Sequence, residues 1–495
     1  MPHIRDLSII LSKGFRRSIS SSIDDCSILR TSALINGHWR KGEQYTVKNA
    51  STSEELCKVT NCGIKDCQDA IKAAKTAFKS YHRLSTAERS QILTDIYDLI
   101  QEHSLDLARL LSLESGKAFQ SSMIDITNAA SWFQFFSKEA SRPSANSEMV
   151  LSPHPRVTLQ VNQPVGVLAF LPHWSFPAAV SRNIAATIAT GNTCVVQPAQ
   201  ETPLTSLALA YLCTQAGLPN GVCNVLPSTQ RPTFEKLLLK NKAVHRLVYI
   251  GPHYMGKNIL NEGRGSGSLE KISLYSRDEV PFIVSDTANV QKAVQDLIQC
   301  RFRLSDQEGS RISRVFVHAS IYDEFARKLV SLVESTSCLG DPFAHKVTYG
   351  PLSDPNETQK LSELIEDAKD KGACVLCGGV KAESLGAGFF RPTVLSNVTQ
   401  EMKIVQKEFY GPIASLEKFD SLQSVFSNVN REHIGSAAYL YSSDSKSIFK
   451  IAAELHVAIL HINTAFNNDY SGMNALLWSS DSDNYVKTKA LIWEP

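Results

Sequence analysis

The sequence predicts an α/β fold built on two parallel sheets, because short β-rich runs alternate with helical stretches in two successive series. The first series starts at about residue 165 and the second after about residue 274. This alternation is typical of parallel strands, since each crossover needs a helix that covers one face of the sheet. A chain of 495 residues, 43% of them hydrophobic, is long enough for two or three domains with large cores.

Charge and composition exclude several classes of function. The 51 basic and 49 acidic residues give a net charge of +2 without a long run of one sign, which does not favour a nucleic-acid partner or a membrane surface. No run reaches the roughly 18 apolar residues of a membrane span. The 11 cysteines have neither a disulfide pattern nor the spacing of a metal site, so we predict no metal. A small-molecule ligand is expected instead.

Residues 1–22 differ in composition from the rest of the chain. Four Lys and Arg residues stand against one acid, Asp6, the apolar residues recur at helical spacing, and a serine run follows. This basic, amphipathic, serine-rich pattern is typical of a mitochondrial transit peptide and predicts a location in the matrix. A cytoplasmic protein with a frayed terminus is the alternative.

The first α/β series predicts alternating strands and helices over residues 165–171, 178–189, 193–196, 204–216 and 222–226. A further strand over residues 246–250 runs into Gly251 and Gly256, and a helix follows. A glycine turn at the amino end of a helix suits a phosphate group, because backbone N–H groups point outwards there. A single G-x-x-x-x-G fits a plain β-to-α turn equally well.

The second series continues the same pattern to about residue 453. It predicts a strand, a helix, a strand and a helix over residues 282–284, 290–301, 315–317 and 321–334. Two outlying segments, residues 157–161 and 489–493, alternate like strands with one exposed face. They predict a small third unit that pairs between subunits.

Five short motifs follow one another along the chain. They read QPVGV at 163–167, PHWSFP at 172–177, QPA at 197–199, GPHYMG at 251–256 and EFYGP at 408–412. With these motifs the chain resembles the aldehyde dehydrogenase superfamily over about residues 34–464. It is most similar to the succinate-semialdehyde dehydrogenase branch. That resemblance implies NAD-dependent oxidation of succinate semialdehyde to succinate, a step of GABA catabolism.

The resemblance also implies three parts. An aldehyde-dehydrogenase-like fold would have a Rossmann-like NAD-binding domain in residues 34–150 and 164–273 and an α/β catalytic domain in residues 274–465. A small β oligomerisation arm would comprise residues 151–163 and 484–495. Such subunits assemble as dimers or tetramers, so a homo-oligomer is expected.

Three catalytic positions depart from the family pattern. The resemblance implies a cysteine nucleophile, a glutamate that activates water and an amide that holds the oxyanion, and Gly309, Tyr275 and Ser175 stand at these positions. Glycine cannot form a covalent intermediate, and a phenol with an ordinary pKa near 10 is a weak base at neutral pH. Loss of one oxyanion donor can by itself slow a reaction about a hundredfold. We therefore predict an inactive or severely impaired dehydrogenase.

The resemblance assigns further positions to the cofactor and to the substrate carboxylate. The cofactor positions are Trp174, Gln197, Gln200, Gly251, Gly256, Glu408 and Tyr410. The two glutamines bring no charge to a phosphate, so NAD is expected rather than NADP. Arg182 and Arg303 match the arginines that grip the substrate carboxylate, a group that suits the planar guanidinium. Retention of both arginines by descent, without a working site, explains them equally well.

Two other functions stay open at this point. A binding or regulatory subunit would join an active relative in a hetero-oligomer through the two outlying strands. A working oxidoreductase would need relocated groups. Ser305 or Ser310 could then replace the nucleophile, and Asp278 or Glu279 could supply a carboxylate.

Overall fold

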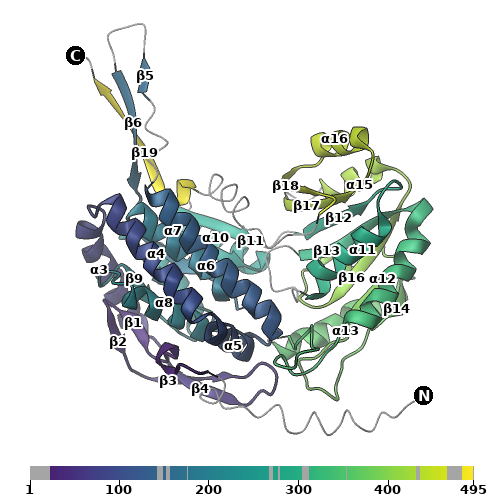
Figure 1. The fold of residues 1–495 in the computed structure, drawn as a ribbon, viewed down its shortest axis with the longest axis horizontal. Helices are drawn as coiled ribbons and strands as arrows, with labels where there is room; N and C mark the ends of the chain where they lie inside the picture. Colours follow the sequence, from purple (N-terminus) through teal and green to yellow (C-terminus); the bar gives the residue numbers. More distant parts are fainter. Residues whose placement is uncertain are drawn as a thin grey trace.

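The computed structural model describes residues 23–141, 149–151, 157–174, 177–266, 271–276, 279–303, 311–352, 354–430, 435–464 and 482–493. Two α/β units lie side by side, and a three-stranded sheet projects from the first unit (Figure 1). The α/β class predicted from the sequence is confirmed. Among the helices of the described ranges, none is long and apolar enough to cross a membrane.

The first unit contains a seven-stranded sheet in the order β11-β10-β7-β8-β9-β1-β2. Its strands are β1 (Ala33–Ile35), β2 (His38–Arg40), β7 (Val167–Leu171), β8 (Thr193–Val196), β9 (Cys223–Val225), β10 (Val244–Gly251) and β11 (Ile272–Ser276). Strands β7 to β11 run parallel, whereas β1 is antiparallel to both of its neighbours. Because β8 and β10 lie on opposite sides of β7, the strand order reverses between β7 and β10. Ligands of open α/β sheets bind outside the carboxyl ends of the strands at such a switch point.

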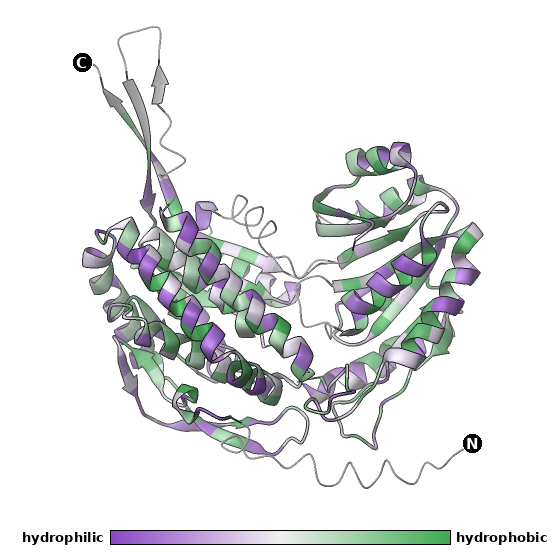
Figure 2. Cartoon of the chain, viewed as in Figure 1, coloured by the Kyte–Doolittle hydropathy of each residue, from purple (hydrophilic) through white to green (hydrophobic). Residues whose placement is uncertain are grey.

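Helices cover both faces of this sheet, and alternate residues of β7 therefore enter two different cores. Leu168 and Phe170 enter the core shared with the helices of one face, while Val167 and Ala169 enter the core of the other face. The first face carries α4 (Thr86–Glu102), α5 (Ser104–Ser115), α6 (Phe119–Ser141), α7 (Val180–Thr190) and α8 (Leu204–Gln215). The second face carries α3 (Ile64–Tyr81), α9 (Arg231–Lys240) and α10 (His253–Ser266). The helices of the first face show stripes of hydrophilic and hydrophobic residues, as amphipathic covering helices do (Figure 2).

The second unit contains a seven-stranded sheet in the order β14-β15-β16-β13-β12-β17-β18. Its strands are β12 (Glu279–Val284), β13 (Arg311–His318), β14 (Cys374–Cys377), β15 (Thr393–Ser396), β16 (Ile413–Phe419), β17 (Gly435–Tyr441) and β18 (Val457–Ile462). Its helices are α11 (Val290–Ile298), α12 (Tyr322–Thr336), α13 (Pro355–Asp370), α14 (Lys403–Gln406), α15 (Leu422–Val429) and α16 (Ser445–Glu454). All strands except β14 run parallel to their neighbours.

The helix predicted over residues 290–301 is shorter in the structure. α11 ends at Ile298, and a π-helical turn follows over Gln299–Arg303. The wider turn brings the fully buried Arg301 guanidinium to two backbone carbonyls, those of Ile413 and Gly411, at 2.6 and 2.7 Å. These charge-assisted hydrogen bonds tie the turn to the start of β16.

The projecting sheet is formed by β5 (Met149–Leu151), β6 (Val157–Pro164) and β19 (Val486–Trp493). The two outlying segments of the sequence are antiparallel neighbours here, with Val157 opposite Trp493 and Val161 opposite Lys489. The arm leaves the body of the first unit beside α7 (Figure 1). A separate pair of strands, β3 (Gln44–Lys48) and β4 (Glu55–Thr60), lies along the lower edge of the same unit.

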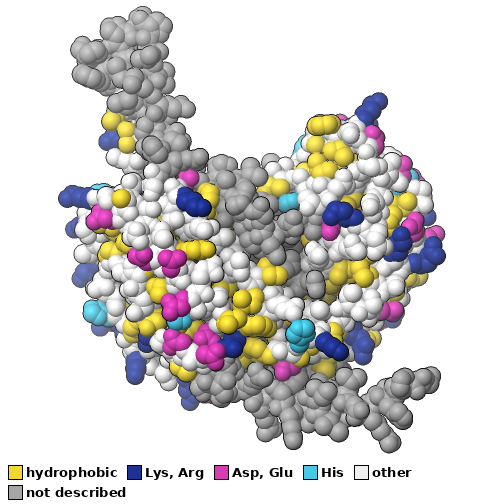
Figure 3. Space-filling view, in the orientation of Figure 1, with side chains coloured by type: hydrophobic (Ala, Val, Ile, Leu, Met, Phe, Trp, Pro, Cys, Tyr) yellow, Lys and Arg dark blue, Asp and Glu magenta, His cyan; other side chains and the backbone are white. Residues whose placement is uncertain are grey.

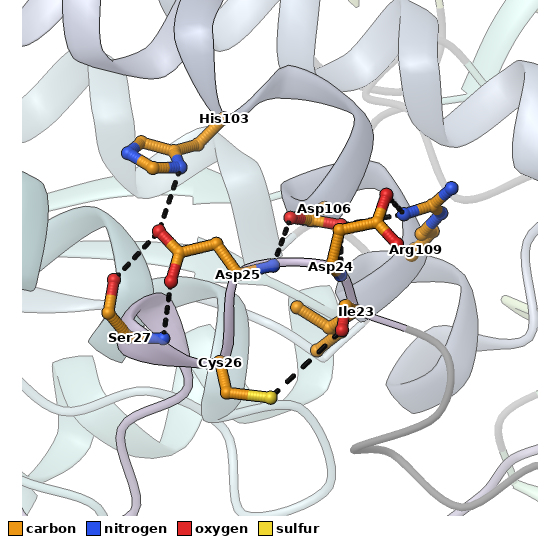
Figure 4. Close-up of polar contacts among 8 residues, drawn as sticks. All are labelled: Ile23, Asp24, Asp25, Cys26, Ser27, His103, Asp106 and Arg109. Carbon is orange, nitrogen blue, oxygen red and sulfur yellow. Dashed lines mark hydrogen bonds and ion pairs between the residues drawn. The ribbon is translucent and has the colours of Figure 1, made fainter.

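The segment of residues 23–29 is tied to α5 by hydrogen bonds to one carboxylate (Figure 4). The two oxygens of Asp106 accept the backbone N–H groups of Asp24 and Asp25 at 3.0 and 2.9 Å. Arg109 pairs with both Asp24 and Asp106, at 2.6 and 2.8 Å. Ile28 is completely buried in the core beneath. We call this set of contacts the N-terminal clasp.

Candidate functional site

The crevice at the switch point collects side chains from three strand ends and from the second unit. Residues 172–174 follow β7, Gln197 follows β8, and Gly251 ends β10. Tyr410 and Glu408 reach the crevice from the loop that precedes β16. Five of the seven positions that the resemblance assigned to a cofactor therefore lie at this edge of the sheet, either just after a strand or in contact with such a residue. They are Trp174, Gln197, Gly251, Glu408 and Tyr410.

Three aromatic rings form one side of the crevice. The rings of His173 and Tyr410 stack, with centroids 5.4 Å apart and an angle of 20° between their planes. Trp174 lies 4.9 Å from His173 and 5.5 Å from Tyr410. Because Tyr410 belongs to the second unit, these rings join the two units where a flat aromatic ligand could pack.

Gln197 has a buried amide that no described residue satisfies. The residue is 2% exposed, and neither Oε1 nor Nε2 has a hydrogen-bond partner among the described residues. A buried amide without partners costs about 1–3 kcal/mol for each polar group, so such a group calls for a ligand or ordered water. Gln200 differs, because it is exposed and its Nε2 donates to Glu201 at 3.0 Å.

The glycine turn after β10 is built on a close approach of backbone and side chain. Gly251 has φ +158°, and a Cβ there would lie 2.5 Å from the hydroxyl oxygen of Tyr249. Pro252 has no N–H group, so the first backbone donor of α10 is that of His253. This N–H donates to Glu408 Oε2 at 3.1 Å. A carboxylate at a helix amino end is electrostatically favourable, and Glu408 thus links the second unit to the turn.

Arg231, at the first position of α9, lies in the same crevice although the sequence did not single it out. Its Nε pairs with Glu235 at 3.0 Å, and the side chains are 18% and 15% exposed. Its Nη1 and Nη2 reach the carbonyl oxygens of Pro172 and Leu171, at 3.3 and 3.5 Å. The guanidinium carbon lies 5.6 Å from the centroid of the Tyr249 ring. An arginine before a proline at a helix start was the one sequence signal, and it says nothing of where the side chain reaches.

A groove of about 600 Å³ extends from Arg231 between α9 and α10. Its floor is apolar, with Leu239, Met255 and Ile259, and its rim carries charged side chains such as Lys236 and Glu262. Arg231 lines this groove and also contacts the end of β7, so it stands between the groove and the crevice.

Tyr275, at the position predicted for the general base, is held by a polar network. Its hydroxyl oxygen accepts a hydrogen bond from Asn484 Nδ2 at 2.7 Å, and Asn484 Oδ1 accepts from the hydroxyl of Ser273 at 2.5 Å. Burial raises the pKa of Tyr275, although Arg182 and Asn484 oppose this shift. The phenol is therefore neutral at physiological pH, and a neutral phenol is a weak base.

The arginines and the other catalytic positions are placed differently. Arg182 lies against two rings, 5.0 Å from the centroid of Trp132 and 5.9 Å from that of Tyr275. Arg303 ends the π-helical turn, and its side chain lies outside the described residues. Gly309 and Ser175, with the alternatives Asp278, Ser305 and Ser310 and the side chain of Glu279, also lie outside them.

The π-helical turn Gln299–Arg303 contains one thiol, that of Cys300. Cys300 is the thiol nearest in sequence to Gly309, and it is 4% exposed in the core of the second unit. Among the described residues, no group of three or more His, Cys, Asp or Glu side chains could hold a metal ion.

Comparisons with known proteins point to one family. The model of the "Aldehyde dehydrogenase family" matches residues 39–475. "Succinate-semialdehyde dehydrogenase [NADP(+)] 1" of Schizosaccharomyces pombe is 36% identical over 460 residues, which cover 91% of this chain and 92% of the relative. The mitochondrial succinate-semialdehyde dehydrogenase of Homo sapiens is 33% identical over 442 residues, covering 88% of this chain and 82% of the relative.

Solved structures match over nearly the whole chain. The crystal structure of succinate-semialdehyde dehydrogenase from Burkholderia pseudomallei has a TM-score of 0.90 at 30% identity and covers 96% of this chain and 100% of its own. Betaine aldehyde dehydrogenase from Staphylococcus aureus in complex with NAD+ has a TM-score of 0.87 at 26% identity, covering 96% and 97%.

Proposed function

Because the chain belongs to the aldehyde dehydrogenase family, we propose that it is a succinate-semialdehyde-dehydrogenase-like member that keeps a dinucleotide crevice and has lost the dehydrogenase reaction. Its ligands would be a nicotinamide cofactor and a small semialdehyde or carboxylate. The family reaction would be the oxidation of succinate semialdehyde to succinate.

The observation that carries this proposal is the environment of Tyr275. A general base must be able to take a proton from water near neutral pH. The Tyr275 hydroxyl is instead an acceptor for Asn484, and burial raises its pKa. Gly309, at the position that the resemblance gives to the nucleophile, has no side chain to attack an aldehyde, and the thiol nearest to it in sequence, that of Cys300, is buried. Both steps of the family reaction thus lack their groups.

The crevice fits the cofactor better than the catalytic positions fit the reaction. A bound nicotinamide cofactor would supply a hydride acceptor. The unsatisfied amide of Gln197 can hydrogen-bond a ribose hydroxyl, and Glu408 can do the same from the opposite unit. The rings of Trp174 and Tyr410 offer faces for a flat base. For a carboxylate ligand, Arg182 supplies a guanidinium against Tyr275.

The test is the formation of NADH or NADPH from succinate semialdehyde by the purified chain, with cofactor binding measured separately by calorimetry. We expect no turnover with either cofactor but measurable binding. A Gly309→Cys plus Tyr275→Glu variant restores both residue types and serves as the comparison. Turnover by the unmodified chain would contradict the proposal. If thiol reagents do not inhibit that turnover, it would favour a working enzyme with relocated groups.

A non-catalytic subunit is the second proposal, because the arm offers a surface for another chain. β6 and β19 stand clear of the body of the first unit (Figure 1). Leu491 on β19 is 42% exposed and is accessible to such a chain. Either a homo-oligomer or a hetero-oligomer with an active relative would cover it.

We also propose a mitochondrial location. The mammalian relatives carry that location in their names, and residues 1–22 have the composition of a transit peptide. Residues 1–22 fused to a fluorescent protein should direct it to mitochondria, and an Arg16→Glu plus Arg17→Glu version should not. Cytoplasmic fluorescence from the unmodified fusion would favour the alternative location.

A further inference from the structure

The charge that Arg231 brings into the switch-point crevice bears on which dinucleotide fits. The sequence favoured NAD because Gln197 is neutral, but that reasoning did not include Arg231. The Glu235 carboxylate holds Nε and so orients the planar fork, leaving the two terminal nitrogens pointing at the carboxyl end of β7. The two terminal nitrogens of such a fork match two oxygens of a phosphate.

The present partners of the fork are weak ones. Nη1 and Nη2 reach the neutral carbonyls of Pro172 and Leu171 only at 3.3 and 3.5 Å. Charge-assisted bonds from arginine to phosphate are about 2.7–2.9 Å long and roughly twice as strong as neutral ones. A phosphate in the crevice would therefore offer the fork stronger acceptors than these carbonyls.

The residues that directly follow β8 are not acidic and would not repel such a phosphate. In dinucleotide folds that select NAD, an acidic residue after the second strand holds the ribose 2′-hydroxyl, whereas a nearby arginine accommodates the 2′-phosphate of NADP. After β8, Gln197 is followed by proline, alanine and Gln200, and the first acid is Glu201, whose carboxylate accepts a hydrogen bond from Gln200. Gln197 can donate its unsatisfied Nε2 to a phosphate oxygen.

We propose that this crevice selects a 2′-phosphorylated dinucleotide of the NADP class, with Arg231 as the residue that recognises the 2′-phosphate and Glu235 as the residue that positions Arg231. This inference rests on the proposed dinucleotide site. It replaces the preference for NAD with the opposite preference.

The experiment measures the dissociation constants of NADPH and NADH for the full chain by calorimetry, with 2′-AMP and 5′-AMP as smaller probes. We expect NADPH and 2′-AMP to bind at least about tenfold more tightly than NADH and 5′-AMP, the effect of one charge-assisted contact. Arg231→Gln should weaken NADPH about 10- to 100-fold and change NADH about twofold or less. Arg231→Lys, which keeps the charge without the fork, should fall between.

Matched variants separate this role from a merely structural one. Lys79→Gln removes the same charge from an exposed position on α3, outside the groove, and should leave the ratio of NADPH to NADH affinity unchanged. Glu235→Gln keeps Arg231 but removes the carboxylate that orients it. It should therefore reduce the preference for NADPH over NADH, but by less than Arg231→Gln does. Thermal unfolding of each variant checks that it is folded.

Each other outcome overturns the proposal in a recognisable way. An equal loss of NADPH and NADH on Arg231→Gln would mean that Arg231 meets the diphosphate common to both. Equal affinities in the unmodified chain would remove the 2′-phosphate assignment while leaving the dinucleotide site intact. Failure of every probe to bind would overturn the dinucleotide site itself, and with it this inference.

Discussion

Individual side chains in the crevice and around Tyr275 have different environments that suit different roles. Gln197 keeps two unsatisfied polar atoms at the end of β8, which is unfavourable unless a ligand or water joins them. Tyr275, by contrast, has its hydroxyl engaged by Asn484. Gln197 can thus bind a ligand or water, whereas Tyr275 already belongs to a hydrogen-bond network with Asn484, two residues before β19.

Tyr275→Phe tests this structural role. The variant leaves the Nδ2 group of Asn484 without its acceptor, so we expect it to lower the free energy of unfolding by about 1 kcal/mol. Asn484→Ala should have a similar effect, and the double variant should cost less than the sum of the two. Urea unfolding measures all three. Tyr254→Phe, at a tyrosine 62% exposed on α10, is the control, and additive effects would contradict the expectation.

A second prediction at this scale concerns Glu114 on α5. Its carboxylate is 1% exposed and accepts hydrogen bonds from the backbone N–H groups of Leu204 and Thr205, at 2.7 and 2.8 Å. Burial raises its pKa to about 7, although the hydrogen bonds from residues 204 and 205 oppose this. Because the folded-state pKa lies above the unfolded one, the stabilising contribution is full below about pH 4.5 and is lost as the pH rises through 7.

Glu114→Gln should therefore flatten the dependence of unfolding free energy on pH. A difference of about 2.5 pKa units corresponds to about 3 kcal/mol between the two ends of the range. Chemical unfolding of both proteins at intervals from pH 4.5 to 8 measures the slope. Glu43→Gln, at an exposed position, should keep the pH dependence of the unmodified chain. An unchanged slope in Glu114→Gln would show that Glu114 does not cause the pH dependence.

At the scale of elements, the N-terminal clasp shows a short segment stabilised by a helix rather than by its own structure. The 3-10 helix Cys26–Ile28 has only three residues, and the side chain of Asp25 caps it by accepting the N–H of Ser27. The Asp106 carboxylate then accepts two backbone N–H groups, as a helix cap would. The clasp thus holds the segment of residues 23–29 against α5.

Asp106→Asn should weaken the clasp. An amide can accept at one atom only, so one backbone N–H and the ion pair with Arg109 lose their partner, at a cost of about 2 kcal/mol. We expect faster cleavage by a protease between residues 23 and 30, seen by mass spectrometry. Asp98→Asn on the neighbouring α4, at an exposed position, should not change the cleavage rate. Equal rates of cleavage in the two variants would contradict the stabilising role of the clasp.

At the scale of the whole molecule, two surfaces look incomplete in a single chain. The arm exposes Leu491, and hydrophobic side chains also gather over α16 and the edge of the second sheet (Figure 3). Phe449 on α16 is 77% exposed and Ile462 on β18 is 39% exposed. In the described part of the chain, β18 pairs on one side only, with β17. Apolar side chains beside a half-paired strand favour contact with another subunit.

Leu491→Lys tests the assembly. If the arm lies in a subunit contact, a buried charge there would reduce the mass measured by light scattering at a fixed concentration. Leu105→Lys, at a leucine 52% exposed on α5, is the matched control and should leave the mass unchanged. An unmodified chain that is monomeric at all concentrations would contradict the prediction. Co-expression with an active relative distinguishes hetero-oligomers from homo-oligomers.

The sequence predicted the strands and helices well where their patterns are local. The run of five apolar residues in β7 and the glycines at 251 and 256 are visible in the residue order. The π-helical turn at residues 299–303 was not predictable, because it depends on carbonyl partners for Arg301 more than 100 residues away. The clasp likewise joins residues more than 80 positions apart.

The sequence by itself determined the fold class, the order of its elements and the residue types at positions 309 and 275, on which the proposal of a lost reaction rests, because these follow from periodicity and from residue type. Only the tertiary structure decided that Arg231 enters the switch-point crevice, that Gln197 is left unsatisfied and that Tyr275 is tied to Asn484. The physical reason is that a side chain's partners, burial and pKa depend on residues that folding brings together from distant parts of the chain, and no local pattern records them.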